Sequence, residues 1–255
     1  MQNAGVSYER KEDALGRHVE HLFEEFFDRC LDQDSGQPRS DEEVKRAQYY
    51  RSQFEALNIS HSRSTILMDF QHLREYDDLL ADAVVDKYFR LEPYIKNALS
   101  SIYVRYIQDG SLENIDRKDI WVAFYNLPKV LKVRDLKTEF VSKLTCISGT
   151  VTRTNQVRPE LMQGKFQCLD CQTPSDMIEQ QFKYTEPVKC RNAACQNTRR
   201  WLLLVGESKF CDWQKVRIQE NSEEIPSGSM PRTMDIILRN DAVETAKAGD
   251  KCRFV

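Results

Sequence analysis

The stretch LTCISGTVTRT, residues 144–154, decides the fold class of the second half of this 255-residue chain. It is rich in Val, Ile and Thr, and its apolar and polar residues alternate, which is typical of a half-buried β-strand. It also carries a glycine at position 149. We therefore predict a strand over residues 144–154.

Three later stretches toward the C-terminus also have the sequence pattern of β-strands. FCDWQKVRIQE (210–220) alternates in the same way, TMDIILR (233–239) is a third strand, and DKCRFV (250–255) begins a fourth. The stretch IPSGSMPR (225–232) between them is a Pro/Gly turn. Short strands with long, irregular connections favour a small β-barrel of the oligonucleotide/oligosaccharide-binding (OB) type over a parallel sheet.

The first half of the chain has helical periodicity instead. Apolar residues between positions 7 and 32 recur at three- and four-residue spacing, which predicts a long amphipathic helix. Residues 64–70 form a short apolar run that suits an extended segment. Residues 77–108 are apolar with helical period, and Pro93 is expected to break or kink this stretch into two helices. The first 110 or so residues are thus predicted to form a small helical bundle.

Four cysteines lie between the predicted strands in two close pairs, C-x2-C and C-x4-C, separated by 18 residues. This is the spacing of a zinc ribbon, in which two turns bring four thiolates around one tetrahedral Zn²⁺. All four histidines lie in the helical half, so the predicted ligand set is all cysteine and the predicted role of the zinc is structural. The alternative interpretation is a redox-active cysteine pair. It needs only one C-x2-C motif, so it does not explain the second pair of cysteines. The predicted ligands are Cys168, Cys171, Cys190 and Cys195.

The predicted fold class is α+β: an N-terminal helical bundle, then an OB-fold β-barrel with an inserted four-cysteine zinc-ribbon subdomain. The expected subdomains are 1–118 for the bundle, 119–160 with 206–255 for the OB-fold, and 161–205 for the zinc-ribbon insertion. The N-terminus has no apolar core that would make a secretory signal. No apolar run approaches the roughly 18–20 residues that a membrane helix needs, so no membrane partner is expected.

Charge is distributed unevenly along the chain. The net charge of −3 combines −7 over residues 1–118 with +4 over residues 119–255. This asymmetry suits a nucleic-acid face on the second half, although on charge alone ordinary surface variation is the favoured explanation of so small an excess. If the cysteine segment is an insertion, the barrel brings the basic residues on either side of it together, in a groove able to follow a phosphate backbone. Trp201, Phe210 and Trp213 are candidate stacking platforms, with a core position the favoured interpretation of Trp213.

Motifs for catalysis are absent from these 255 residues. Neither a phosphate loop of the G-x4-G-K-[ST] type nor a G-x-G-x-x-G motif occurs, and the β half contains no histidine. The sequence therefore does not predict an enzyme that acts alone.

Several segments in the right order resemble one family. VRDLKTEFVSKLTCISGTVTRTNQVRPEL (133–161), FQCLDCQ (166–172), FCDWQKVRIQE and IPSGSMPRTMDIILRNDAVETAKAGDKCRF (225–254) look like the N-terminal region of a minichromosome maintenance (MCM) replicative DNA helicase. DIWVAFYNLP (119–128) and FKYTEPVKCRNAACQNTRRWLL (182–203) most resemble one eukaryotic subunit of that family.

The resemblance implies a nuclear DNA-replication protein whose six related subunits form a heterohexameric ring. In the family the ring encircles single-stranded and duplex DNA, and two rings meet head to head through their zinc subdomains. It also implies that this chain is a fragment without the ATPase module, so that ATP and Mg²⁺ belong to the missing C-terminal part of a helicase. The family's single-strand-binding motif carries over onto Arg153, Arg158, Lys215, Arg217 and Arg232.

Three functions remain open at this point. The first is a DNA-gripping and ring-assembly region that binds single-stranded DNA without sequence preference. The second is a pure protein-interaction module with negligible DNA binding in isolation. The third, an independent zinc-ribbon and OB single-strand binding protein, does not explain why the chain ends within a strand.

Overall fold

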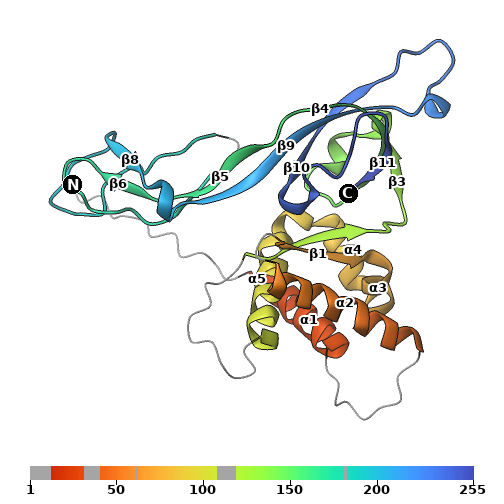
Figure 1. The fold of residues 1–255 in the computed structure, drawn as a ribbon, viewed down its shortest axis with the longest axis horizontal. Coiled ribbons are helices and arrows are strands. Elements are labelled where there is room, and N and C mark those ends of the chain that lie inside the picture. The colour runs from red at the N-terminus through yellow and green to blue at the C-terminus, as the bar shows by residue number, and fades with distance from the viewer. Residues whose placement is uncertain (1–12, 32–40, 61–62, 108–118, 181–182) are drawn as a thin grey trace. The chain divides into compact units, whose positions relative to one another are not determined.

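The computed structural model describes residues 13–31, 41–60, 63–107, 119–180 and 183–255 (Figure 1). It divides into two compact units, Met1–Ser148 with Arg253–Val255 and Gly149–Cys252. Each unit is described by itself below. The ends of the first predicted helix and the predicted boundary at residue 118 lie outside the described residues.

Helices make up most of the first unit, as the periodicity predicts. Rings from the first two helices pack edge to face: the Phe27 ring lies 5.5 Å from that of Tyr50 and 5.8 Å from that of Phe54, centroid to centroid. All three side chains are fully buried, and such aromatic pairs add to the free energy gained from burial alone. The helices are α1 (Ala14–Leu31), α2 (Asp41–Ile59), α3 (Phe70–Tyr76), α4 (Asp78–Asp86) and α5 (Tyr88–Ile107).

The predicted helix break at Pro93 is wrong in position. Pro93 lies inside α5, and the helix boundary falls at Lys87, whose φ of −129° and ψ of 31° are not helical. A proline inside a helix has no N–H to donate to the carbonyl four residues earlier. Pro93 is the sixth residue of α5, so only a bond to the Phe89 carbonyl is lost. The sequence of 77–108 thus forms two helices, but with a different junction.

The extended segment predicted at 64–70 is strand β1 (Thr65–Asp69). It runs parallel to β2 (Trp121–Tyr125), with Ile66 opposite Val122 and Met68 opposite Phe124. Sequence reasoning places residues 121–125 in the OB segment, whereas the structure pairs them with β1 inside the first unit. The division of the chain into three subdomains stays a prediction.

The remaining strands form a seven-stranded sheet and a short two-stranded one. In the larger sheet the order is β11-β4-β9-β5-β7, with β10 paired to β9 and β3 to β4; in the smaller, β6 pairs antiparallel with β8. All four strands predicted in this half are present. The bounds are β3 (Val130–Lys132), β4 (Cys146–Thr154), β5 (Arg158–Gly164), β6 (Phe166–Cys168), β7 (Ile178–Glu179), β8 (Trp201–Leu203), β9 (Lys209–Gln219), β10 (Thr233–Arg239) and β11 (Lys251–Phe254).

Strand β9 is the centre of the second unit. Its alternation separates buried Val216 and Ile218 from Lys215 and Arg217 on the other face. Strand β4 approaches it closely at Gly149, where an added Cβ would lie 2.9 Å from the Ile218 Cδ1 atom and 3.1 Å from the Gln219 carbonyl oxygen. Glycine is therefore required at position 149 by strand proximity.

Candidate functional site

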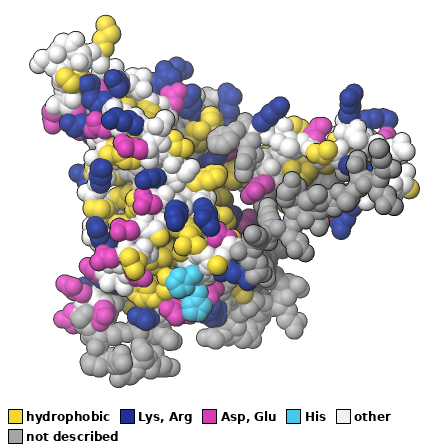
Figure 2. Space-filling model, turned by 180° about the vertical axis from the view of Figure 1, so that it is seen from behind, with side chains coloured by type: hydrophobic (Ala, Val, Ile, Leu, Met, Phe, Trp, Pro, Cys, Tyr) yellow, Lys and Arg dark blue, Asp and Glu magenta, His cyan; other side chains and the backbone are white. Residues whose placement is uncertain are grey.

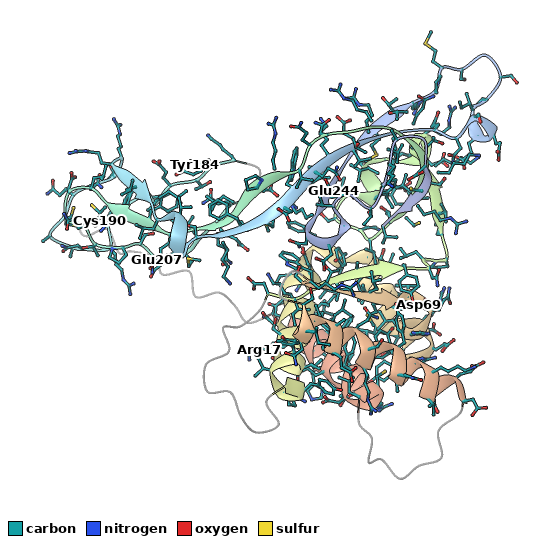
Figure 3. The ribbon with its side chains drawn as sticks, in the orientation of Figure 1. Arg17, Asp69, Tyr184, Cys190, Glu207 and Glu244 are labelled. Carbon is teal, nitrogen blue, oxygen red and sulfur yellow. The ribbon has the colours of Figure 1, made fainter. Side chains whose placement is uncertain are left out.

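The four cysteines of the zinc-ribbon motif come together in the second unit. Cys168 ends β6, and Cys195 lies in the loop that leads into β8. The antiparallel pairing of these two strands sets Cys168 opposite Trp201. This pairing brings the chain that carries the second cysteine pair back beside the first pair. Figure 3 shows the labelled Cys190 at one end of this unit.

The sulfur positions suit a tetrahedral metal ion. All four Sγ atoms lie within 4.8 Å of one another. The Cys171 and Cys190 sulfurs are 3.4 Å apart, and the Cys168 and Cys195 sulfurs are 3.8 Å apart. Four thiolates about 2.3 Å from a central Zn²⁺ would be about 3.8 Å from one another. The donor set is therefore the right size for such an ion.

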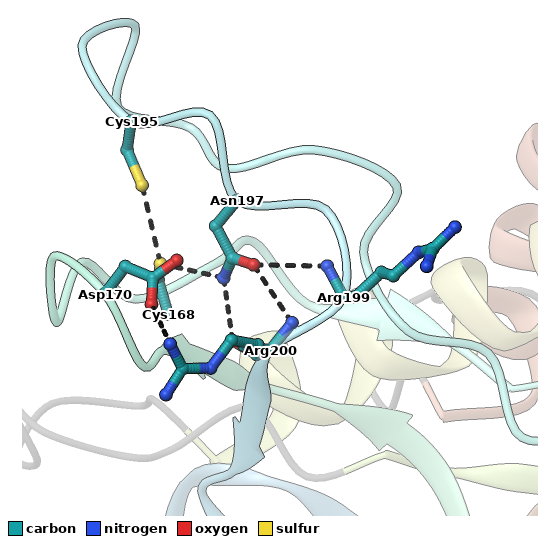
Figure 4. A network of polar contacts seen from close by, with 6 residues as sticks. All are labelled: Cys168, Asp170, Cys195, Asn197, Arg199 and Arg200. Atoms are coloured by element: carbon teal, nitrogen blue, oxygen red, sulfur yellow. Dashed lines mark hydrogen bonds and ion pairs between the residues drawn. The ribbon is translucent and has the colours of Figure 1, made fainter.

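Asn197 organises the loops around the cluster (Figure 4). Its side-chain amide donates to the Cys168 sulfur at 3.0 Å and to the Arg200 carbonyl at 2.7 Å. Its side-chain oxygen accepts the backbone N–H groups of Arg199 and Arg200, and its backbone carbonyl accepts the N–H of Cys190. The Asn197 side chain is 7% exposed. Sequence reasoning missed this residue, because an asparagine two positions after a cysteine carries no signal of its own.

The thiols differ in acidity. The hydrogen bonds from the side chain and backbone of Thr173 lower the pKa of Cys171 to about 6. For Cys195, the Asn197 backbone N–H lowers the pKa, but burial and the neighbouring thiols outweigh it and raise the pKa to about 12. Four thiolates packed this closely repel one another, and a bound cation removes that repulsion. The chemistry of the cluster thus favours metal binding over a set of free thiols.

Four of the five predicted DNA-binding residues share one face of the sheet, which we call the basic face: Arg153, Arg158, Lys215 and Arg217. Arg153 of β4 lies opposite Arg217 of β9, and Arg158 of β5 lies opposite Trp213 of β9. Residues opposite each other in antiparallel strands point to the same side, as do alternate residues of one strand. The folded sheet therefore unites basic residues that lie more than 60 positions apart in sequence.

The fifth residue, Arg232, is not part of the basic face. It precedes β10. The Glu220 backbone N–H donates to the Arg232 carbonyl, and the Glu220 carboxylate accepts the Arg232 N–H, both at 3.0 Å. Glu220 is 2% exposed. It continues the alternation of the buried residues of β9 and therefore points to the opposite face from Arg217. The register thus separates Arg232 from the other four.

An acidic residue neutralises part of the basic face. Asp235 of β10 lies opposite Arg217 and contacts both Arg217 Nε and Lys215 Nζ at 2.7 Å. These two hydrogen-bonded cations hold the pKa of Asp235 far below its usual range. In the described part of the chain, neither Arg153 nor Arg158 has an ion-pair partner. On the side of the molecule that Figure 2 shows, Lys and Arg side chains lie among acidic and hydrophobic ones.

Comparison with known proteins places the chain in a family. A model of the MCM N-terminal domain matches residues 20–126, and a model of the MCM OB domain matches residues 132–255. The second match confirms the predicted OB-type domain. Among the described helices, none has both the length and the apolar content needed to cross a membrane.

Curated relatives share the same name. The chain is 44% identical to DNA replication licensing factor mcm6 of Schizosaccharomyces pombe over 95% of this chain and 28% of the relative. It is 49% identical to the mcm6 protein of Dictyostelium discoideum over 81% of this chain and 24% of that relative. These relatives are named for the sixth eukaryotic subunit, the one that residues 119–128 and 182–203 most resemble.

The chain therefore spans about a quarter of the length of these relatives. The two matched domains follow each other along almost all of its sequence, and in the order that the resemblance predicts. On this basis the chain belongs to the minichromosome maintenance (MCM) family.

Proposed function

We propose that this chain is the DNA-binding and ring-assembly region of a nuclear replicative helicase subunit. In this proposal it binds single-stranded DNA without sequence preference, and it also faces duplex DNA in the channel of a heterohexameric ring. The motor activity, with its ATP and Mg²⁺, belongs to another part of the subunit. Membership of the MCM family and the licensing-factor names of the relatives support this proposal.

The observation that carries the proposal is the alignment of Arg153 with Arg217 across β4 and β9. Together with Arg158 it makes a basic face in which two arginines have no ion-pair partner among the described residues. Such side chains neutralise phosphates and release counterions, so the affinity for nucleic acid falls as salt rises. The binding is independent of base sequence because the phosphates carry no sequence information.

A salt titration tests the basic face. Fluorescence anisotropy with a labelled oligothymidylate measures the affinity of the chain at several salt concentrations. Replacing Arg153 by Ala should weaken binding and reduce the slope of log affinity against log salt by about 0.7, the value for one phosphate contact on a single strand. Lys45→Ala, which removes an exposed charge from α2, is the matched control. An identical slope for both variants would remove Arg153 from the interface.

The four-cysteine cluster is proposed to be a structural zinc ribbon. The sulfur spacing and the Asn197 hydrogen bond to Cys168 support this assignment. Zinc in such modules supplies folding free energy, on the order of 10–16 kcal/mol in small peptides. In the proposed ring the ribbon supplies contacts to the neighbouring subunits and to a second ring placed head to head.

Metal analysis of Cys190→Ser tests the zinc site. We expect one zinc per wild-type chain, loss of that zinc in the variant, and fast hydrogen exchange over residues 160–205. Cys252→Ser, which removes a thiol outside the cluster, should keep the metal and the protection. Retention of one zinc per chain in Cys190→Ser would contradict the ligand assignment.

One observation favours the alternative, a protein-interaction module with negligible DNA binding in isolation. Asp235 already neutralises Lys215 and Arg217, which leaves fewer cations for phosphates. Analytical ultracentrifugation with and without single-stranded DNA separates the two functions. Self-association without any change on adding DNA would favour the interaction module.

A further inference from the structure

Trp213 occupies an unexpected position in the second unit. Gln214, Val216 and Ile218 of β9 are buried on one face of the strand. Trp213 alternates with them and points to the other face, together with Lys215 and Arg217. The indole is half-buried and therefore lies on the basic face rather than in the core. The favoured core interpretation of this residue is wrong.

Arginines flank Trp213 on both neighbouring strands. Arg158 of β5 and Arg239 of β10 are its direct cross-strand partners. Strands in a sheet lie about 4.8 Å apart, so both side chains rise beside the indole on the same face. Trp213 is thus an apolar ring within a row of cations.

Ion pairs anchor the side chains on either side of this row. Arg239 makes two hydrogen bonds to Glu160 of β5, at 2.6 and 3.0 Å. Since Glu160 lies opposite Cys211, this pair crosses β9 next to Trp213. On the other side, Lys215 is held by Asp235. These contacts fix the positions of two long side chains beside the indole.

The other two tryptophans are engaged differently. Lys96 Nζ lies 3.9 Å from the centre of the Trp121 ring, and the Trp201 indole nitrogen is buried. In the described part of the chain, no cation and no aromatic ring is stacked on Trp213. Among the described tryptophans, Trp213 is therefore the one that lies on the basic face with no cation or ring stacked on it.

We propose that Trp213 is a stacking platform for one base of a single-stranded nucleic acid, with the backbone phosphates held by Arg158 and Arg153. This inference rests on the proposed DNA binding and adds a preference for single strands. In a duplex the bases are stacked on one another and present only their edges. An unpaired base, by contrast, offers its flat surface to an aromatic side chain whatever its identity.

The test separates base contacts from phosphate contacts. The 255-residue chain is titrated with an oligothymidylate and with an abasic oligomer of the same length and charge. Trp213→Ala should lower the affinity for oligothymidylate by at least about five-fold, the equivalent of one stacked base. It should leave both the salt slope and the affinity for the abasic oligomer unchanged. Ile237→Ala, which removes a half-exposed apolar side chain from β10 on the same face, is the matched control.

Intrinsic fluorescence gives a second readout that does not depend on the alanine variant folding. Oligothymidylate should quench part of the wild-type tryptophan emission. Trp213→Phe, which keeps an aromatic ring, should bind nearly as well as the wild type but lose that quenching.

Three results would count against the inference in distinguishable ways. Equal losses for Trp213→Ala on both oligomers, or no loss while Arg153→Ala still weakens binding, would overturn stacking and leave the basic face intact. No binding of either oligomer by the wild-type chain would overturn the proposed DNA binding and the stacking together.

Discussion

The side-chain nitrogen of Asn197 lies 3.0 Å from the sulfur of Cys168 and donates a hydrogen bond to it. The backbone carbonyl of the same asparagine accepts the N–H of Cys190 at 3.1 Å. One residue thus ties the first cysteine pair to the second. Hydrogen bonds of this kind orient a metal ligand and reduce the charge density on its sulfur.

Asn197→Ala is expected to loosen the proposed zinc site without removing a ligand. Loss of a group that orients a metal ligand typically lowers metal affinity 10- to 100-fold, so zinc transfer to a competing chelator should occur at about ten-fold lower chelator concentration. Asn192→Ala is the control, because the Asn192 side chain accepts the N–H of Ala194 and contacts no sulfur. Equal zinc retention in both variants would show that Asn197 holds the loop conformation but does not affect zinc affinity.

Asp235→Asn is expected to strengthen DNA binding. The substitution keeps the shape of the side chain but releases Lys215 and Arg217 from their carboxylate. With two more cations available, the salt slope for oligothymidylate should steepen by up to about 1.4. Glu223→Gln, which frees Lys251, makes the same change of charge at another site. The same rise in affinity for both variants would indicate a general charge effect.

The Asp13–Arg90 ion pair should make the first unit sensitive to acid. Arg90 Nε lies 2.6 Å from one Asp13 oxygen, and this hydrogen bond lowers the pKa of Asp13 from 3.8 to about 2. A lowered carboxyl pKa stabilises the folded state above the unfolded value, and that stabilisation is lost as pH falls from about 4 toward 2. Asp13→Asn should therefore lower the melting temperature at pH 6, and the difference from wild type should shrink below pH 4.

The control for that experiment is Asp82→Asn, which alters an exposed carboxylate on α4. Its melting temperature should stay close to wild type across the same pH range. A difference for Asp13→Asn that is constant from pH 6 to pH 2.5 would exclude ionisation of Asp13 as the cause.

Gly149→Ala should destabilise the second unit. The added methyl group would meet the buried Ile218 side chain and the Gln219 carbonyl, both on β9. Overpacking of this kind costs about 1–3 kcal/mol, more than the alanine gains from its reduced freedom in the unfolded chain. Urea unfolding measures the change, with Gly206→Ala as the control, since nothing lies within 4 Å of its added Cβ. Equal stability of the two variants would show that β4 can move away from β9.

Local patterns were sufficient for β1, β4, β9, β10 and β11 and for the cysteine cluster, but not for the other strands. Alternation in 233–239 reproduces β10 residue for residue, because one buried face imposes a period of two. The cysteine spacing indicates the cluster because a zinc ribbon supplies its four tetrahedral ligands from two close pairs, one on each of two turns. In contrast, the helix junction falls at Lys87 and not at Pro93, and periodicity alone does not mark where α5 begins.

The sequence by itself determined which residue types are available: four cysteines at ribbon spacing, basic residues on two strands, and an amphipathic helical half. Only the tertiary structure decided which of these residues lie next to one another. Register set Arg153 against Arg217, turned Arg232 away, placed Asp235 between two cations and set Trp213 beside Arg158. The physical reason is that strand pairing joins residues distant in sequence, and a shift of one residue moves every side chain to the opposite face.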